Sequence, residues 1–245
     1  MKICEQFASI QGEGKYIGVP SFFIRTVGCN LRCCWGNEDG SVTRCDTEYT
    51  SFNIENWFAF DIYSFKRELL NKFPNIYHVV ITGGEPLLQD DLCEMIQQLL
   101  NERNMIITIE TNGTVYNPEL VKLKSNVFMS FSPKLKSSYY ATGRELEMHK
   151  KNNDFYSVIL NYIYDDGLDH QLKYVVNGSN DDIKEIVGYS EYFDSQGNQT
   201  YLMPQGIDGE TMTKNLQQYV DLCLEYGYNL TDRLHIRIWG NKREV

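Results

Sequence analysis

Long apolar runs and an excess of basic residues are both missing from this 245-residue sequence. No stretch approaches the roughly 20 apolar residues of a membrane-spanning helix, and the opening MKICEQFASIQGEG lacks the apolar segment of a signal peptide. The formal net charge of −10 argues against broad binding to nucleic acids or anionic membranes, which requires a basic face. We therefore expect a cytoplasmic protein that binds neither nucleic acid nor membrane.

Internal repeats and low-complexity segments are also absent from the sequence, so a solenoid or a linker-rich protein is not expected. Hydrophobic residues make up 42% of the chain and charged residues 23%, which is typical of globular proteins. A chain of this length can bury a sizeable core in one unit. We predict a single domain over residues 1–245.

Cysteine, in contrast, is concentrated: four of the seven cysteines fall in residues 28–47, GCNLRCCWGNEDGSVTRCDT. In a reducing compartment such clustering favours a metal or catalytic site over disulfides. Four thiolates would suit zinc, but Cys33 and Cys34 are adjacent, and neighbouring side chains of an extended segment point to opposite sides. Three thiolates would suit a 4Fe–4S cluster with one iron open. The cysteines alone leave zinc, the cluster and unliganded buried thiols as alternatives.

Apolar strand-like runs alternate with helical patterns along most of the chain. The predicted strands are residues 21–27, 77–82, 105–110, Val127–Phe131, 172–176 and Thr200–Pro204. The predicted helices are residues 62–73, 87–103, a segment beginning near Asn180, and 211–226. Residues 134–163 show no clear apolar period, and we expect a long loop with a small hairpin there. Alternating strands and helices with nearly all-apolar strands predict an α/β fold with a parallel sheet covered by helices.

Polar motifs follow four of the predicted strands at the point where each strand ends. They are TGGEP (82–86), ETNGT (110–114), SPK (132–134) and MPQG (203–206). The carboxyl edge of a parallel sheet is where active sites of α/β folds are built. The sequence therefore predicts a functional site at this edge.

The cysteine segment and its flanks resemble the 7-carboxy-7-deazaguanine synthases, a branch of the radical S-adenosylmethionine enzymes. The start of that family is matched by three pieces in order: SIQGEGKYIGVPSFFIRTVGCNLRC, Trp35 and Cys45-Asp46-Thr47. Residues 36–44 are inserted before the third cysteine. The four strand-end motifs and the closing LHIRIWGNKREV have counterparts in the same order. The resemblance implies a partial, modified (β/α) barrel of the radical S-adenosylmethionine type, with about six parallel strands and reduced helical cover.

The resemblance also implies the cofactors and the residues that hold them. Cys29, Cys33 and Cys45 would bind a 4Fe–4S cluster, with Cys34 as the alternative middle ligand, and Thr47 would bind Mg²⁺. S-adenosylmethionine would contact eight residues, namely Gly83, Gly84, Glu85, Ser132, Pro133, Lys134, Pro204 and Gln205. The substrate would contact Ile10, Gln11, Gly12, Glu13, Arg25 and Thr82, whereas His235 is as well explained by a structural role.

The activity implied is a carbon–nitrogen lyase that turns 6-carboxytetrahydropterin into 7-carboxy-7-deazaguanine and ammonia in queuosine-type 7-deazapurine biosynthesis. By analogy we expect a homodimer and an electron donor such as flavodoxin. One rival is a glycyl-radical-enzyme activase of the same superfamily, which would not need the IQGEG segment and a downstream arginine. The other is a non-enzymatic zinc- or cluster-stabilised binding module, which would not need the four strand-end motifs.

Overall fold

The computed structural model describes residues 1–36, 40–51, 53–177, 179–194, 197–206, 209–214 and 216–244. Part of the insertion at residues 36–44 lies outside these ranges. Within them, no helix combines the length and the apolar character needed to cross a membrane.

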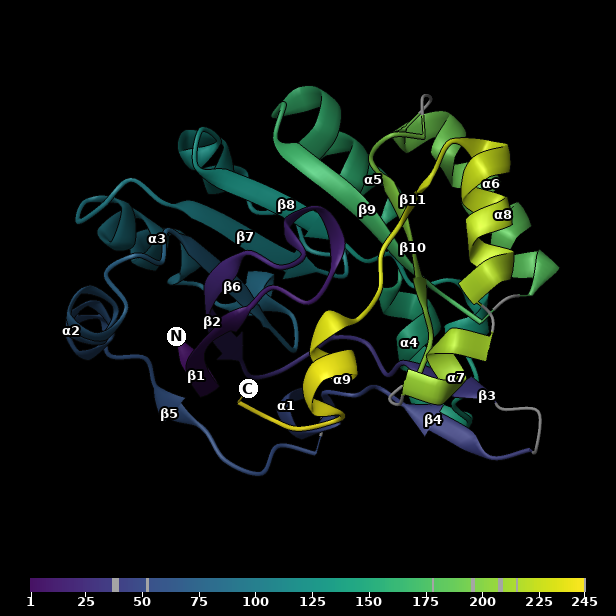
Figure 1. Cartoon of the computed structure of the whole chain (residues 1–245), viewed down its shortest axis with the longest axis horizontal. Helices are drawn as coiled ribbons and strands as arrows, with labels where there is room; N and C mark the ends of the chain where they lie inside the picture. The colour runs from purple at the N-terminus through teal and green to yellow at the C-terminus, as the bar shows by residue number, and fades with distance from the viewer. Residues whose placement is uncertain are drawn as a thin grey trace.

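A nine-stranded sheet forms the centre of the molecule (Figure 1). Its order is β11-β10-β9-β8-β7-β6-β2-β1-β5, and neighbouring strands from β2 to β11 pair in parallel, whereas β1 and β5 pair antiparallel at one edge. The strands are β1 Lys2–Ile10, β2 Pro20–Thr26, β5 Phe58–Ala59, β6 His78–Gly83, β7 Ile106–Thr111, β8 Val127–Phe131, β9 Asp169–Val176, β10 Thr200–Pro204 and β11 Asn229–Leu230. In the described ranges, six parallel strands have five or more residues, as the family resemblance predicted.

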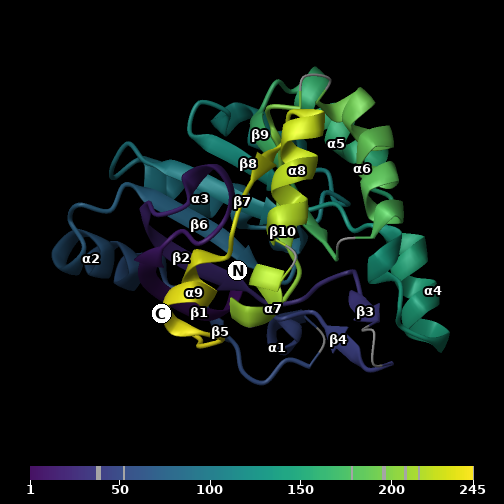
Figure 2. The same cartoon turned by 45° about the vertical axis from the view of Figure 1, so that its right-hand side comes forward.

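Helices connect the parallel strands, and a short ribbon stands apart from the sheet (Figure 2). The ribbon pairs β3, Cys34–Gly36, with β4, Val42–Arg44. The helices are α1 Glu48–Ser51, α2 Ile62–Lys72, α3 Leu92–Leu100, α4 Gly143–Asn152, α5 Tyr156–Leu160, α6 Asn180–Phe193, α7 Gly209–Lys214, α8 Leu216–Tyr226 and α9 Leu234–Trp239.

The two faces of the sheet differ because side chains alternate along a strand. Ile24, Ile81 and Ile109 are fully buried in the main hydrophobic core, on the side that α2 and α3 cover. Their neighbours Thr82 and Glu110 point to the opposite face and line a cavity. One face of the sheet therefore stabilises the fold, and the other carries the polar groups of a site.

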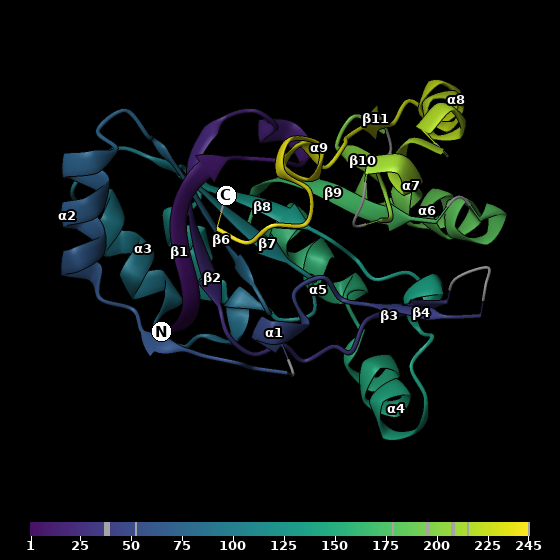
Figure 3. The same cartoon turned by 60° about the horizontal axis from the view of Figure 1, so that its bottom comes forward.

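We call the face that carries the polar groups the inner face of the sheet. A turn after β1 closes this face at the amino ends of the parallel strands. Lys15 lies in the 3₁₀ helix Gly14–Tyr16, and its backbone N–H donates to Gln171 Oε1 of β9 at 2.7 Å. Four strands separate β1 from β9 in the sheet, so this contact requires a strongly curved sheet. The curvature matches the partial barrel expected from the resemblance. Figure 3 shows α9 lying over the inner side, away from α2 and α3.

Two expectations from the sequence need correction, and one long strand was not expected. Residues 134–163 form α4, α5 and the π-helical turn Asn161–Asp165, not a loop with a hairpin. The sequence of α4 is mostly polar and buries only His149, so it has no apolar period to detect. The helix expected at residues 87–103 begins only at Leu92, after a 3₁₀ turn over Pro86–Leu88. Strand β1 was not predicted.

Candidate active site

A cavity of about 360 Å³ lies on the inner face of the sheet. It is lined by most of the residues singled out in the sequence: Ile10, Gln11, Gly12, Glu13, Arg25, Cys29, Cys33, Cys45, Thr47, Thr82, Gly83, Gly84, Ser132, Lys134, Pro204 and Gln205. Glu85 and Pro133 are not among its lining residues. Segments that are far apart in the sequence therefore share one cavity.

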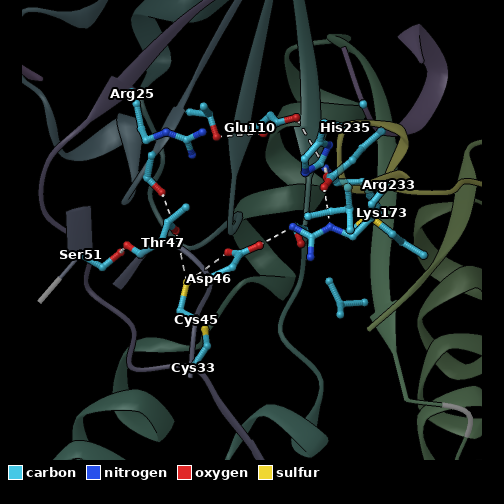
Figure 4. Close-up of a pocket in the computed structure, with 18 of the residues that line it drawn as sticks. Arg25, Cys33, Cys45, Asp46, Thr47, Ser51, Glu110, Lys173, Arg233 and His235 are labelled. Carbon is cyan, nitrogen blue, oxygen red and sulfur yellow. Dashed lines mark hydrogen bonds and ion pairs between the residues drawn. The ribbon is translucent and has the colours of Figure 1, made fainter. Parts of the chain in front are cut away.

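Cys29, Cys33 and Cys45 line one part of this cavity, and Figure 4 shows Cys33 and Cys45 side by side. Cys33 is buried with Leu31 and Trp35, and Cys29 and Cys45 pack against this small cluster. The backbone N–H of Cys45 donates to the Cys33 carbonyl at 3.2 Å, so the return of the chain along β4 brings the third thiol back to the second. Burial raises the pKa of the Cys29 thiol to about 11 and also raises that of Cys45, while the nearby Lys134 acts in the opposite direction on both.

Cys34 lies outside the cavity lining. It pairs with Arg44 in the ribbon, and its carbonyl accepts a hydrogen bond from the Tyr140 N–H at 3.0 Å. Burial raises the pKa of its thiol, while Arg44 lowers it and Glu145 of α4 raises it. The two adjacent cysteines thus point different ways: Cys33, just before β3, lines the cavity, and Cys34, the first residue of β3, lies on the α4 side.

Helix α4 supports the cysteine segment from outside. Nδ1 of His149 accepts the Arg32 N–H at 3.1 Å, and the Asn152 side chain donates to the Asn30 carbonyl at 2.8 Å. Burial lowers the pKa of His149 to about 4, which keeps the ring neutral and Nδ1 free to accept. Helix α4, which has no apolar period in its sequence, therefore holds the backbone between Cys29 and Cys33.

The Gly83-Gly84 turn at the end of β6 lies directly against the segment that leads into Cys29. The φ of Gly83 is +118°, and a Cβ at Gly84 would come within 2.0 Å of the Gly28 carbonyl oxygen. Only glycines permit this approach. The Glu85 carboxylate is fully buried and accepts hydrogen bonds from the Thr111 hydroxyl at 2.7 Å and the Asn112 N–H at 2.8 Å. Glu85 thereby fixes the TGGEP turn to the ETNGT turn.

The SPK and MPQG motifs are anchored through the backbone. The Ser132 N–H donates to the Thr111 carbonyl at 2.8 Å, and the Gln205 N–H donates to the Val176 carbonyl at 2.9 Å. Lys134 Nζ donates to Ser132 Oγ at 2.8 Å. Each motif continues the sheet beyond its strand, which places Ser132, Lys134 and Gln205 on the cavity wall.

Charged side chains of alternating sign occupy the centre of the cavity (Figure 4). Lys173 of β9 is 5% exposed and forms ion pairs with Glu13 and, at 3.5 Å, with Glu110. Glu110 Oε2 accepts the Thr82 hydroxyl at 2.8 Å, and its Oε1 accepts the Gln11 side-chain amide at 3.1 Å. Although burial alone would raise the pKa of Glu13, Lys173 and Arg233 lower it well below its usual range. Glu13 is therefore a carboxylate at neutral pH.

Arg25 reaches the cavity from β2, next to Thr82 in the pairing register. Its Nε donates to Glu5 Oε2 at 2.9 Å, and the Tyr49 hydroxyl donates to the same oxygen at 3.2 Å. Burial would lower the pKa of Arg25, but Tyr49 and Glu5 raise it. Glu5 and Tyr49 thus orient a charged guanidinium.

Thr47 lies between the cysteines and the glycine turn. Its hydroxyl is 3.3 Å from Cys45 Sγ and 3.4 Å from the Gly83 carbonyl oxygen. Its backbone carbonyl accepts the Thr50 and Ser51 hydroxyls at 2.9 and 3.1 Å. The side-chain hydroxyl therefore faces the cavity while the backbone shapes the start of α1.

His235 of α9 also lines the cavity, over Gly12. A Cβ at Gly12 would come within 2.1 Å of His235 Nδ1, so glycine allows the ring to approach the backbone there. Burial lowers the pKa of His235, although Glu13 raises it. The ring is thus a neutral neighbour of the Gln11–Glu13 turn.

The cavity residues that were not predicted from the sequence include Lys173, Glu110, Arg233 and the Asp46 side chain. Lys173 and Glu110 each interrupt or end an apolar strand run, LKYVV and IITIE. A charged residue in a buried parallel strand must have a partner, and this signal could have identified both. Asp46 and Arg233 do not interrupt apolar strands, so nothing in the local sequence marks them as site residues. They are far apart in the sequence, and the fold brings them into contact.

Comparison with known proteins identifies the family. The model of the radical SAM superfamily matches residues 23–187. A 7-carboxy-7-deazaguanine synthase of Rhodopirellula baltica is 34% identical over 98% of this chain and 87% of its own length. The chain belongs to the 7-carboxy-7-deazaguanine synthase family. The synthase of Halobacterium salinarum is 32% identical over 100% of this chain and 93% of its own.

The fold agrees with this assignment. The crystal structure of QueE from Escherichia coli superposes with a TM-score of 0.64, at 24% identity, over 96% of this chain and 94% of that one. Membership of the 7-carboxy-7-deazaguanine synthase family makes the chain a radical SAM enzyme, and a lyase, which uses a 4Fe–4S cluster and S-adenosylmethionine. The resemblance noted in the sequence is confirmed, and neither the activase nor the binding module is favoured.

The residues present fit these cofactors. No three His, Cys, Asp or Glu side chains in the described part of the chain converge closely enough to hold a single metal ion. Cys29, Cys33 and Cys45 instead lie along one wall of the cavity, and a 4Fe–4S cluster takes one thiolate at each of several irons. Lys134 supplies a positive charge that favours their deprotonated forms.

Proposed function

We infer that this chain converts 6-carboxy-5,6,7,8-tetrahydropterin to 7-carboxy-7-deazaguanine with loss of ammonia. The observation that carries this inference is the shared cavity: three thiols and the Gly83-Gly84 turn lie at one end, and Glu13 and Arg25 lie beyond them. The curated relatives from Rhodopirellula baltica and Halobacterium salinarum bear the name of this activity and align over nearly the whole chain.

Cys29, Cys33 and Cys45 would hold the 4Fe–4S cluster, and Cys34 serves as a packing thiol. Gly83 and Gly84 would receive the methionine end of S-adenosylmethionine through backbone groups, and Ser132, Lys134 and Gln205 would contact its ribose and adenine. When bound, the cluster and S-adenosylmethionine supply one-electron chemistry that removes hydrogen from carbon. Glu85 acts indirectly, because its carboxylate is occupied in holding Thr111 and Asn112.

The chain's own residues recognise and orient the pterin. The aminopyrimidinone edge of a pterin presents several N–H donors, and Glu13 and Glu110 line the cavity with carboxylates that can accept them. Gln11 and Thr82 hold Glu110 in place. Lys173 forms ion pairs with both carboxylates, so binding of the pterin edge would not leave an unpaired charge buried in the cavity. Arg25, oriented by Glu5, would pair with the ring oxygen or the carboxylate of the substrate.

Mg²⁺ would bind at Thr47. The Thr47 hydroxyl and the Gly83 carbonyl offer neutral oxygen donors 3.4 Å apart at the cavity edge, and Asp46 adds negative charge nearby. Mg²⁺ prefers oxygen ligands and keeps several waters, so substrate oxygens and water would complete its shell. Its charge would hold the substrate carboxylate and fix the orientation of the ring.

We extend the proposal to the rest of the assembly by analogy with the family. The chain would act as a single domain, pair with a second copy as a homodimer, and receive electrons from a donor such as flavodoxin. Sedimentation of the reconstituted protein tests the dimer separately from the activity.

The activity is tested by anaerobic incubation of the reconstituted protein with S-adenosylmethionine, dithionite, Mg²⁺ and 6-carboxytetrahydropterin. We expect both 5′-deoxyadenosine and 7-carboxy-7-deazaguanine by mass spectrometry. Formation of 5′-deoxyadenosine without the deazaguanine, at saturating pterin, would contradict the substrate assignment and favour a glycyl-radical-enzyme activase. Absence of both from protein with a full complement of iron would contradict the assignment as a whole.

A further inference from the structure

Arg233 joins three of the motif loops that form the active site. It lies in the linker between β11 and α9, its side chain is 11% exposed, and it lines the cavity (Figure 4). Its Nε donates to Glu13 Oε1 at 3.0 Å, and its Nη1 donates to the Gly206 carbonyl at 2.7 Å. Its Nη2 forms an ion pair with Asp46.

The three acceptors belong to segments with different tasks. Glu13 is in the turn that would read the pterin edge, Gly206 ends the MPQG motif, and Asp46 stands between Cys45 and Thr47. A guanidinium presents its donors in one rigid plane, so three simultaneous contacts fix the relative positions of all three acceptors. A lysine carries a point charge on a flexible stem and cannot reproduce this pattern.

Charge makes the arrangement dependent on arginine. Glu13 and Asp46 are both carboxylates, and each forms an ion pair with the same Arg233 guanidinium. Burial alone would lower the pKa of Arg233, but Asp46 and Glu13 raise it, so the guanidinium stays charged between them. Without Arg233, the two carboxylates would repel each other across the cavity.

We propose that Arg233 is a positioning residue that couples pterin recognition at Glu13 to the placement of the Asp46-Thr47 segment. The proposal rests on the proposed function and deepens it. When the three loops are held together, the substrate is presented to the cysteine end of the cavity in one orientation. When the contacts to Arg233 are lost, the pterin-reading turn and the cysteine segment move independently.

The test compares Arg233→Lys with Asp46→Asn and with Arg237→Lys as a matched control. Arg237 is a nearby arginine of α9 that binds Asp232 and the Gly209 carbonyl at 2.8 and 2.6 Å and does not line the cavity. Binding of 6-carboxytetrahydropterin is measured anaerobically in reconstituted protein with S-adenosylmethionine, without reductant and with EDTA, so that neither turnover nor Mg²⁺ contributes.

We expect Arg233→Lys and Asp46→Asn each to weaken pterin binding about tenfold, the order of one charge-assisted hydrogen bond. The double variant should be no weaker than Arg233→Lys alone, because both changes release the same contact. Arg237→Lys should bind as the wild type does. The 5′-deoxyadenosine formed per deazaguanine under turnover should rise in the first two variants only.

Pterin affinity within twofold of wild type in Asp46→Asn would overturn the proposal, since the ion pair with Arg233 is the contact through which Asp46 would hold the pterin turn. An equal loss in Arg237→Lys would also overturn it. Asp46→Asn alters one half-exposed side chain, so it decides the question even if Arg233→Lys does not fold. Failure of wild-type protein to bind or convert the pterin would count against the proposed function and not against this coupling.

Discussion

At the scale of single residues, Thr47 and the adjacent cysteines Cys33 and Cys34 have the most specific predicted roles. Thr47 directs its hydroxyl toward the cavity between Cys45 and Gly83, and its carbonyl toward Thr50 and Ser51. Those two functions are separable, because only the hydroxyl is removed by substitution with alanine. A metal role and a turn role therefore predict different phenotypes.

Thr47→Ala should keep the iron chromophore and need on the order of tenfold more Mg²⁺ for half-maximal turnover, because one oxygen ligand is lost from a weak shell. Thr47→Ser keeps the hydroxyl and should follow the wild-type curve. Activity titrated against Mg²⁺ in the three proteins provides the measurement. Superimposable curves, once scaled to their maximal rates, would show that Thr47 has no metal role.

The adjacent cysteines give a second residue-scale prediction. Cys33→Ser should lose the chromophore and the cleavage of S-adenosylmethionine, because Cys33 faces the cavity with Cys29 and Cys45. Cys34→Ser should keep both and lose about 1 kcal/mol of stability, since a hydroxyl replaces a buried thiol. Iron content and the visible spectrum of both variants after reconstitution show which cysteine is the ligand. The reverse pattern would make Cys34 the ligand.

At the scale of elements, the ends and faces of the strands determine where the chemistry lies. The strand pattern of the sequence predicted Val127–Phe131 and Thr200–Pro204 with their observed bounds, because both runs are apolar and end at clear turns. It could not assign Lys173 and Glu110 to one cavity, since that depends on the register between β7, β8 and β9. It also missed α4, whose role is to hold Arg32 and Asn30 and which buries only His149.

The amino end of the inner face is held together by His78 of β6. Its Nδ1 is 2.7 Å from Ser21 Oγ of β2, and its Nε2 is 2.7 Å from Thr108 Oγ1 of β7. Burial lowers the pKa of His78 to about 4, whereas an unfolded histidine titrates near 6.5. Between these values the unfolded chain binds the extra proton, so acid favours unfolding.

Stability should therefore fall as the pH drops from about 6.5 to about 4, with His78 contributing on the order of 3 kcal/mol. His78→Gln has no charge to gain and should show a shallower decline. Urea unfolding at several pH values measures the difference between the two proteins. Parallel pH profiles for wild type and variant would contradict a neutral His78 in the folded state.

At the scale of the whole molecule, the curved sheet brings the cysteine segment and the charged side chains of Glu13, Arg25 and Lys173 together in one cavity. The turn after β1 closes the inner face against β9, and the cysteine segment closes the carboxyl edge. Family membership and the α/β fold were accessible from the sequence because ordered motifs carry them. The ion pairs inside the cavity were not, since Lys173, Arg233 and Asp46 reach Glu13 and one another from distant parts of the chain.

The proposed function requires that the cavity hold the pterin so that the hydrogen on its carboxylate-bearing carbon is the one removed. Turnover of 6-carboxytetrahydropterin carrying deuterium at that carbon, in the reconstituted wild-type protein, tests the claim most directly. We predict that deuterium appears in 5′-deoxyadenosine or in recovered S-adenosylmethionine, together with 7-carboxy-7-deazaguanine. Deazaguanine formation with no deuterium in either adenosyl compound would contradict the account.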